Sequence, residues 1–132
     1  MVITNINPVG NFDCWSPKAL LEIHQNQFSE EIGRPLFENS EFKLWQINLK
    51  PGERLPFRRH NKTYSCNCLT DGLLLSRNVN GAIDMLRFDR GETYFRECSQ
   101  EAIHDLENIG NVAVQITIVE EKLRCMEPAR QL

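Results

Sequence analysis

Turn signals recur at intervals along this 132-residue chain, and they constrain its fold more than any other feature. They separate short runs of residues that have strand character. The signals are Lys50-Pro51-Gly52, Asp71-Gly72, Asn80-Gly81, Asp89-Arg90-Gly91 and Asn108-Ile109-Gly110-Asn111. Spacings of about nine to twenty residues between such signals are typical of an all-β sandwich or barrel.

The runs between the turns carry strand patterns. Asn80-Gly81 predicts a type I′ hairpin, with positive φ at both residues, that joins residues 73–77 to residues 82–88. Residues 41–49 carry apolar side chains on both faces, as a strand covered on both sides does. Residues 112–118 alternate β-branched apolar residues with small or polar ones, which predicts a last strand with one face toward the core.

The two ends of the chain have a different character. Ser16 as an N-cap and Pro17 at the first helical position predict a short helix, whereas the residues before them are polar and rich in turns. The segment after Glu120 is charged and leaves room for a partial helix. We therefore expect an N-terminal arm with a short helix over residues 1–34, a barrel over residues 35–119 and a C-terminal tail over residues 120–132.

Composition excludes several classes of protein. Apolar residues at 41% and charged residues at 25% are ordinary for a soluble domain, and a net charge of −3 provides no field that favours nucleic acid or an anionic membrane. The sequence contains neither a secretory signal pattern nor a run of apolar residues long enough to span a bilayer. We expect a cytoplasmic protein without nucleic-acid or membrane partners. The five cysteines show no common zinc-binding spacing, so free thiols are expected.

Ionisable and nucleophilic residues gather between Pro51 and Gly72. Because side chains alternate along a strand, Arg58 and His60 share one face, and an unbroken strand adds three further residues to it. These three are Tyr64, Cys66 and Cys68. The two cysteines are expected to be small buried hydrophobes, since only Arg58 is near enough in sequence to stabilise a thiolate.

The sequence resembles the cupin superfamily of small double-stranded β-helix barrels over residues 35 to 119. The first cupin motif matches the spacing from Gly52 through His60 to Gly72, and the second matches Gly91-Glu92 and a closing His104-Asp-Leu-Glu-Asn108. The resemblance implies an all-β, cupin-type jelly-roll barrel. Pro-Gly-Glu, Leu-Thr-Asp-Gly, Gly-Glu-x-Tyr-Phe-Arg and His-Asp are in addition similar to single-domain cupins associated with β-alanine degradation.

The match to the family's metal ligands is incomplete. His60 and His104 occupy two ligand positions, but Arg58 stands where the first histidine belongs, and the glutamate position falls on Tyr64 or Ser65. Alternation favours Tyr64 as the inward-facing residue. The second motif also lacks its proline and glycine. A guanidinium repels a cation in a low-dielectric interior, so loss of the metal is the expected effect.

Two chemical interpretations of the site remain open. In the first, Arg58, His60, Tyr64 and His104 bind a carboxylate or phosphate metabolite, and the same residues offer an acid and a base for metal-free catalysis. In the second, His60 and His104 hold a single divalent iron, nickel, manganese or zinc ion in a dioxygenase or lyase with an altered ligand set.

Three alternatives give these residues a purely structural role or leave the site without a function. Arg58 can form a structural ion pair with an acidic residue such as Glu92, Tyr64 can simply fill the barrel, and the whole protein can be a sensory or structural one with a vestigial site. Asp105 follows His104 directly, so a regular strand points it away from the imidazole. Whether the protein is an enzyme is left undecided by the sequence, and the family resemblance implies a homodimer.

Overall fold

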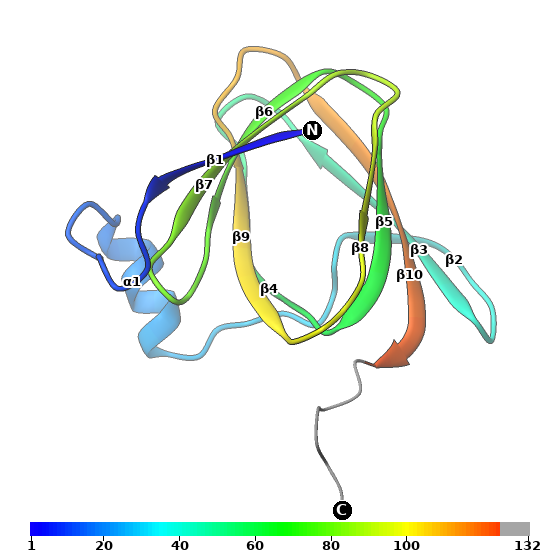
Figure 1. Cartoon of the computed structure of the whole chain (residues 1–132), viewed down its shortest axis with the longest axis horizontal. Helices are drawn as coiled ribbons and strands as arrows, with labels where there is room; N and C mark the ends of the chain where they lie inside the picture. Colours follow the sequence, from blue (N-terminus) through cyan, green and yellow to red (C-terminus); the bar gives the residue numbers. More distant parts are fainter. Residues whose placement is uncertain (125–132) are drawn as a thin grey trace, which may run out of the picture.

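The chain forms two five-stranded antiparallel sheets that face each other across the interior of a barrel (Figure 1). The computed structural model describes residues 1–124. Sheet A, on the left of Figure 1, has the strand order β1-β7-β6-β9-β4, and sheet B, on the right, has the order β2-β3-β10-β5-β8. The predicted all-β, jelly-roll architecture is therefore confirmed.

The elements follow the predicted turns closely. Their bounds are β1 (Val2–Asn7), α1 (Pro17–His24), β2 (Arg34–Glu38), β3 (Phe42–Leu49), β4 (Arg54–His60), β5 (Lys62–Cys68), β6 (Gly72–Arg77), β7 (Ile83–Phe88), β8 (Thr93–Arg96), β9 (Ala102–Asn108) and β10 (Val114–Arg124). Gly52 and Gly91 adopt φ angles of 84° and 91°, which L side chains rarely reach, so these two turns depend on glycine.

The β6–β7 hairpin exists, but its turn differs from the predicted type I′. Gly81 has a φ of 103°, whereas Asn80 does not have positive φ. The loop is longer than two residues because the Asn78 amide donates to the Ala82 carbonyl at 2.8 Å. Within it, the Gly81 amide donates back to the Asn78 carbonyl at 2.9 Å, so only the glycine needs the left-handed conformation.

The N-terminal segment packs on the outer face of sheet A. Helix α1 begins as predicted, with the Ser16 hydroxyl accepting a hydrogen bond from the Ala19 amide at 3.2 Å. Residues Trp15, Ala19, Phe57 and Ile83 form a second apolar cluster between the helix and the sheet. The segment expected to be an arm also contains β1, which pairs with β7 at the edge of sheet A. The division into arm, barrel and tail stays a prediction.

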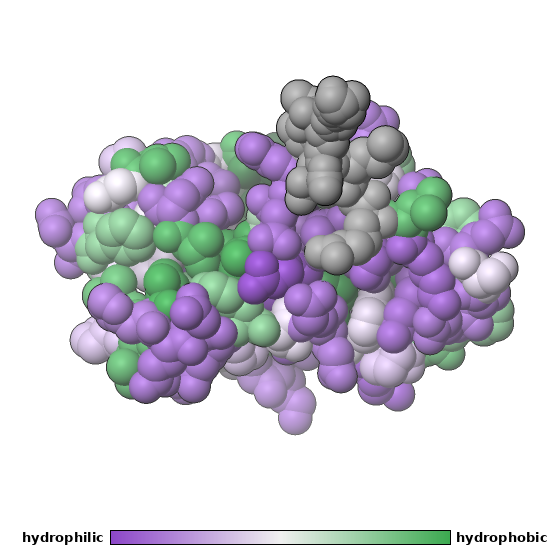
Figure 2. Space-filling view, turned by 90° about the horizontal axis from the view of Figure 1, so that it is seen from below, coloured by the Kyte–Doolittle hydropathy of each residue, from purple (hydrophilic) through white to green (hydrophobic). Residues whose placement is uncertain are grey.

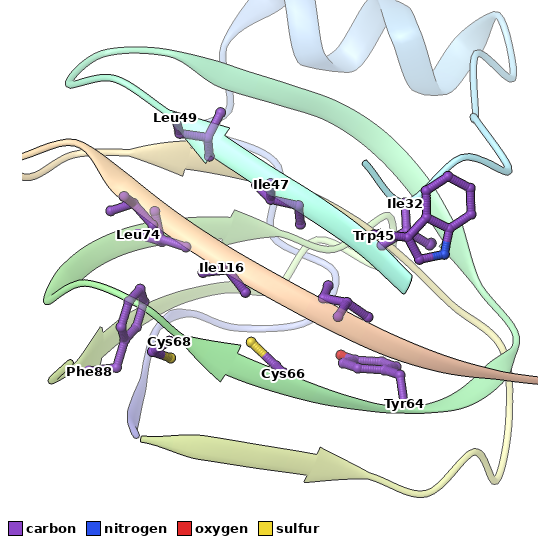
Figure 3. Packing of buried hydrophobic residues seen from close by; sticks show 12 residues of the cluster. Ile32, Trp45, Ile47, Leu49, Tyr64, Cys66, Cys68, Leu74, Phe88 and Ile116 are labelled. Atoms are coloured by element: carbon purple, nitrogen blue, oxygen red, sulfur yellow. The ribbon is translucent and has the colours of Figure 1, made fainter. Parts of the chain in front are cut away.

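The main core lies between the two sheets. Figure 3 shows apolar side chains converging from β3, β5, β6, β7 and β10, among them Ile47, Leu74, Phe88 and Ile116. This core leaves one side of the barrel interior to the polar residues of β4 and β9.

At the C-terminal end, β10 continues to Arg124 and pairs with both β3 and β5. The partial helix in which the tail could end lies outside the described residues. No helix among residues 1–124 is long and apolar enough to span a membrane.

Figure 2 shows the end of the barrel at which β4 turns into β5, where hydrophilic residues predominate around the centre. The cytoplasmic location and the homodimer stay predictions.

Candidate functional site

Strands β4 and β5 bring most of the predicted site residues to one cavity. The cavity has a volume of about 230 Å³, and Arg58, His60, Tyr64 and Cys66 all line it. The chain changes sheet at Asn61, so Arg58 and His60 belong to sheet A while Tyr64 and Cys66 belong to sheet B. Their predicted common face is thus the inside of the barrel.

His104 completes the predicted set from β9. It lies directly opposite Arg58 in the β4–β9 pairing, and it also lines the cavity. The His60 and His104 rings are stacked, with centroids 4.4 Å apart and planes inclined by 6°. The centroid of the Tyr64 ring lies 5.4 Å from the centroid of the His60 ring. The structure therefore brings Arg58, His60, Tyr64 and His104 together, as expected.

Arg96 is a site residue that the sequence reasoning missed. It lies at the end of β8, directly opposite Tyr64, and its side chain lines the same cavity. The signal was present in Gly91-Glu-Thr-Tyr-Phe-Arg96, because alternation places Tyr94 and Arg96 on one face of a strand. Only the pairing of β8 with β5 shows that this face looks into the barrel.

Neither cavity arginine forms an ion pair with a carboxylate of residues 1–124. Within residues 1–124, the ion pairs of the structure involve neither Arg58 nor Arg96. Arg58 Nε and Arg96 Nη1 are buried without a hydrogen-bond partner. The suggested Arg58–Glu92 ion pair is wrong, since Glu92 contacts the Met1 ammonium and the Asp89 amide instead.

Asp105 faces away from the imidazole of His104, as alternation predicts. Its carboxylate is fully buried and accepts hydrogen bonds from Arg54 Nε at 2.7 Å and from Arg77 Nη1 at 3.0 Å. Arg54 in turn binds Glu22 of helix α1 through two hydrogen bonds of 2.8 and 2.9 Å. This network fastens the helix to sheet A, and it occupies the only fully buried acid near the cavity within residues 1–124.

Burial sets the protonation of the site. It lowers the pKa of His60 well below 6.5, and the nearby His104, Arg96 and Arg58 lower it further. Burial also lowers the pKa of His104, although the Asp105 carbonyl opposes this shift. Burial raises the pKa of Tyr64 to about 12. At neutral pH both imidazoles are therefore uncharged, the phenol is protonated, and the guanidiniums carry the positive charge of the cavity.

The donor set does not fit a metal ion of the cupin type. Residues 1–124 contain no group of three or more His, Cys, Asp or Glu side chains placed to hold a metal. An imidazole binds a metal along a lone pair in its ring plane, and the two nearly parallel, stacked rings of His60 and His104 direct these lone pairs into separate planes. Arg58 and Arg96 add positive charge beside them. The alternative of a metal held by His60 and His104 therefore finds no support in the geometry.

The cysteines near the site behave as packing residues. Cys66 and Cys68 are buried free thiols, and burial raises the pKa of Cys66 to about 12. A thiol with such a pKa is not a nucleophile at neutral pH. Cys14 is also free, whereas Cys98 is disulfide-bonded, so the expectation of free thiols is wrong at that residue. Cys125 lies outside the described residues.

Comparisons with known proteins support the fold through structure alone. No protein-family model and no curated protein matches the sequence. A cupin domain from Bordetella pertussis Tohama I matches with a TM-score of 0.62 and 22% identity, over 72% of this chain and 96% of that one. A double-stranded β-helix domain protein from Klebsiella pneumoniae matches with a TM-score of 0.53 and 14% identity, over 70% and 72% of the two chains.

A third similar structure is the cupin domain of Schizosaccharomyces pombe Cnp3, with a TM-score of 0.50 and 16% identity, over 66% of this chain and 61% of that one. Similarities at this level of identity concern the fold and not the reaction, so the association with β-alanine degradation stays a prediction. Sheet topology and structural neighbours together identify the chain as a small barrel with the double-stranded β-helix fold of cupin domains.

Proposed function

We infer that this protein binds a small anionic metabolite, a carboxylate or a phosphate, inside the barrel. The observation that carries the proposal is the pair of cavity arginines, Arg58 and Arg96, which have no carboxylate partner within residues 1–124. Both side chains are only partly buried, but Arg58 Nε and Arg96 Nη1 are shielded from water, and a shielded guanidinium nitrogen that lacks an acceptor is costly to the folded state. An anion in the cavity supplies both the missing charge and the missing hydrogen-bond acceptors.

The neutral groups around the arginines suit the same ligand. Tyr64 keeps its proton and can donate it in a hydrogen bond to a ligand, and His60 and His104 are uncharged at neutral pH. Arginine binds the two oxygens of a carboxylate or phosphate through parallel hydrogen bonds, which fixes the orientation of the ligand. Two arginines and a phenol thus form a recognition site for one anionic head group.

Proton transfer on the bound anion is the second candidate function. His60 Nδ1 is buried without a hydrogen-bond partner, so in the tautomer that carries its proton on Nε2 this nitrogen can accept a proton from a ligand. Tyr64 lies beside it as a proton donor. A vestigial sensory or structural role fits less well, because a cavity of about 230 Å³ remains open between the sheets.

Isothermal titration calorimetry with a panel of small anions tests the binding proposal. The panel contains acetate, hexanoate, benzoate, succinate and inorganic phosphate. We expect wild type to bind at least one of them, and Arg58→Gln and Arg96→Gln each to weaken that affinity at least about tenfold, since hydrogen bonds to charged groups contribute about 1.5–3 kcal/mol.

Arg59→Gln is the matched control for these variants. Arg59 is next to Arg58 but points out of the barrel, where it pairs with Glu30 at 3.2 Å and with Glu101 at 2.8 Å. Its substitution should leave the affinity unchanged. Failure of wild type to bind any anion, or equal losses in all three variants, would contradict the proposal.

A further inference from the structure

The cavity has a polar end and an apolar end, and the cross-strand partners show this division. Residues directly opposite each other on paired strands share a face of the sheet. At the polar end the opposite pairs are Arg58 with His104, Tyr64 with Arg96, and Ser76 with Asp84. Further along the same strand pairs they are Leu55 with Leu106, Cys66 with Tyr94, and Leu74 with Leu86. All twelve residues line the cavity, so these three pairs of strands each change from polar to apolar along their length.

The apolar end is closed by packed side chains. Figure 3 shows Tyr64 at one end of β5, and Leu74 and Phe88 near Cys68 at its other end. Phe88 lies opposite Gly72, where an added Cβ would come within 2.3 Å of the phenyl ring, so the ring fills the space that the glycine leaves. A ligand that enters with its charged group at the arginines therefore directs the rest of its structure toward leucine and phenylalanine side chains.

The charges around the cavity favour one negative charge on the ligand. Among the lining residues, Arg58 and Arg96 contribute two positive charges and Asp84 at the polar end contributes one negative charge, whereas the Met1 ammonium is neutralised by its ion pair with Glu92. Asp105 also borders the cavity, but its carboxylate is bound by two arginines that do not line it. The net charge of one positive unit is balanced by a monoanion, whereas a dianion leaves an excess negative charge in a desolvated site.

We propose that the ligand is a monocarboxylate with a short apolar tail. Its carboxylate lies between Arg58 and Arg96, and its tail extends along Leu74 and Leu86 toward Phe88. The cavity, at about 230 Å³, is smaller than the pockets of about 300–1,000 Å³ that hold drug-sized ligands, so the tail is short. This inference rests on the proposed anion-binding function and narrows it to one class of anion.

A series of linear monocarboxylates from acetate to decanoate tests the tail, with affinities measured by calorimetry on the wild-type protein. Each added methylene should tighten binding about fourfold, because burying one contributes about 0.8 kcal/mol. The gain should stop at the chain length that fills the cavity and then reverse.

Leu86→Gln places a polar group beside the tail and should remove most of the gain with chain length, while the affinity for acetate is kept. Arg87→Gln is its control, because Arg87 is exposed on the outer face of the same strand. If Leu86→Gln does not fold, the dependence of wild-type affinity on chain length is by itself the test of the apolar tail.

Two outcomes overturn this inference and leave the proposed function standing. One is an equal affinity for acetate and hexanoate that still depends on Arg58. The other is tighter binding of succinate or phosphate than of any monocarboxylate. Absence of binding by every anion tested overturns the proposed function and this inference together.

Discussion

Substitution of Asp105 by asparagine should destabilise the fold by about 3 kcal/mol. The carboxylate is fully buried and accepts three hydrogen bonds, from Arg54 Nε at 2.7 Å, from Arg77 Nη1 at 3.0 Å and from the Arg77 amide at 2.6 Å. Removing one partner of a buried ion pair typically costs about 3–5 kcal/mol. Arg54 keeps Glu22 and Arg77 keeps Glu107, which places the expected cost at the lower end of this range.

Urea denaturation, followed by tryptophan fluorescence, measures this loss as a change in the free energy of unfolding. Domains are typically stable by about 5–15 kcal/mol, so a loss of this size is easily resolved. Glu107→Gln is the matched control, because it removes a partly exposed partner of Arg77 and should cost less than about 1 kcal/mol. A loss below about 1 kcal/mol in Asp105→Asn would refute the reasoning that the buried network holds sheet A together.

Three further predictions concern packing, pH and metal content. Gly72→Ala should cost about 1–3 kcal/mol, because its Cβ would meet the buried Phe88 ring at 2.3 Å, and thermal unfolding unchanged from wild type would contradict this. Because the pKa of His60 is depressed in the folded state, the unfolded chain binds more protons below about pH 6.5. The free energy of unfolding should therefore decrease as the pH is lowered below about 6.5, by up to about 1.4 kcal/mol per pH unit for this residue. If the free energy of unfolding of His60→Gln depends on pH as steeply as that of wild type, His60 is excluded as the source of this dependence. Elemental analysis of tag-free protein should give well below one iron, nickel, manganese or zinc per chain, whereas a value near one that His60→Ala abolishes would restore the metal site.

The fold could largely be predicted from the sequence because its signals are local. Ser16-Pro17 specifies the start of α1, and the Pro-Gly and Asp-Gly turns specify where strands end. Alternation along β4 and β5 was enough to place Arg58, His60 and Tyr64 on one face, although the chain changes sheet between them. The turn at Asn80 was predicted wrongly, since the hydrogen bond between Asn78 and Ala82 selects a longer loop than the dipeptide suggests.

By itself, then, the sequence determined most of the strands, although not β1, together with the helix and the inward orientation of the first site residues, because these follow from backbone preferences of neighbouring residues. Only the tertiary structure decided that Arg96 lies opposite Tyr64, that His60 stacks on His104, and that no carboxylate among residues 1–124 pairs with the cavity arginines. These facts depend on the register between strands that are distant in sequence. Burial then gives the site its chemistry, since the same arginines and histidines exposed to water would be hydrated and carry no preference for a ligand.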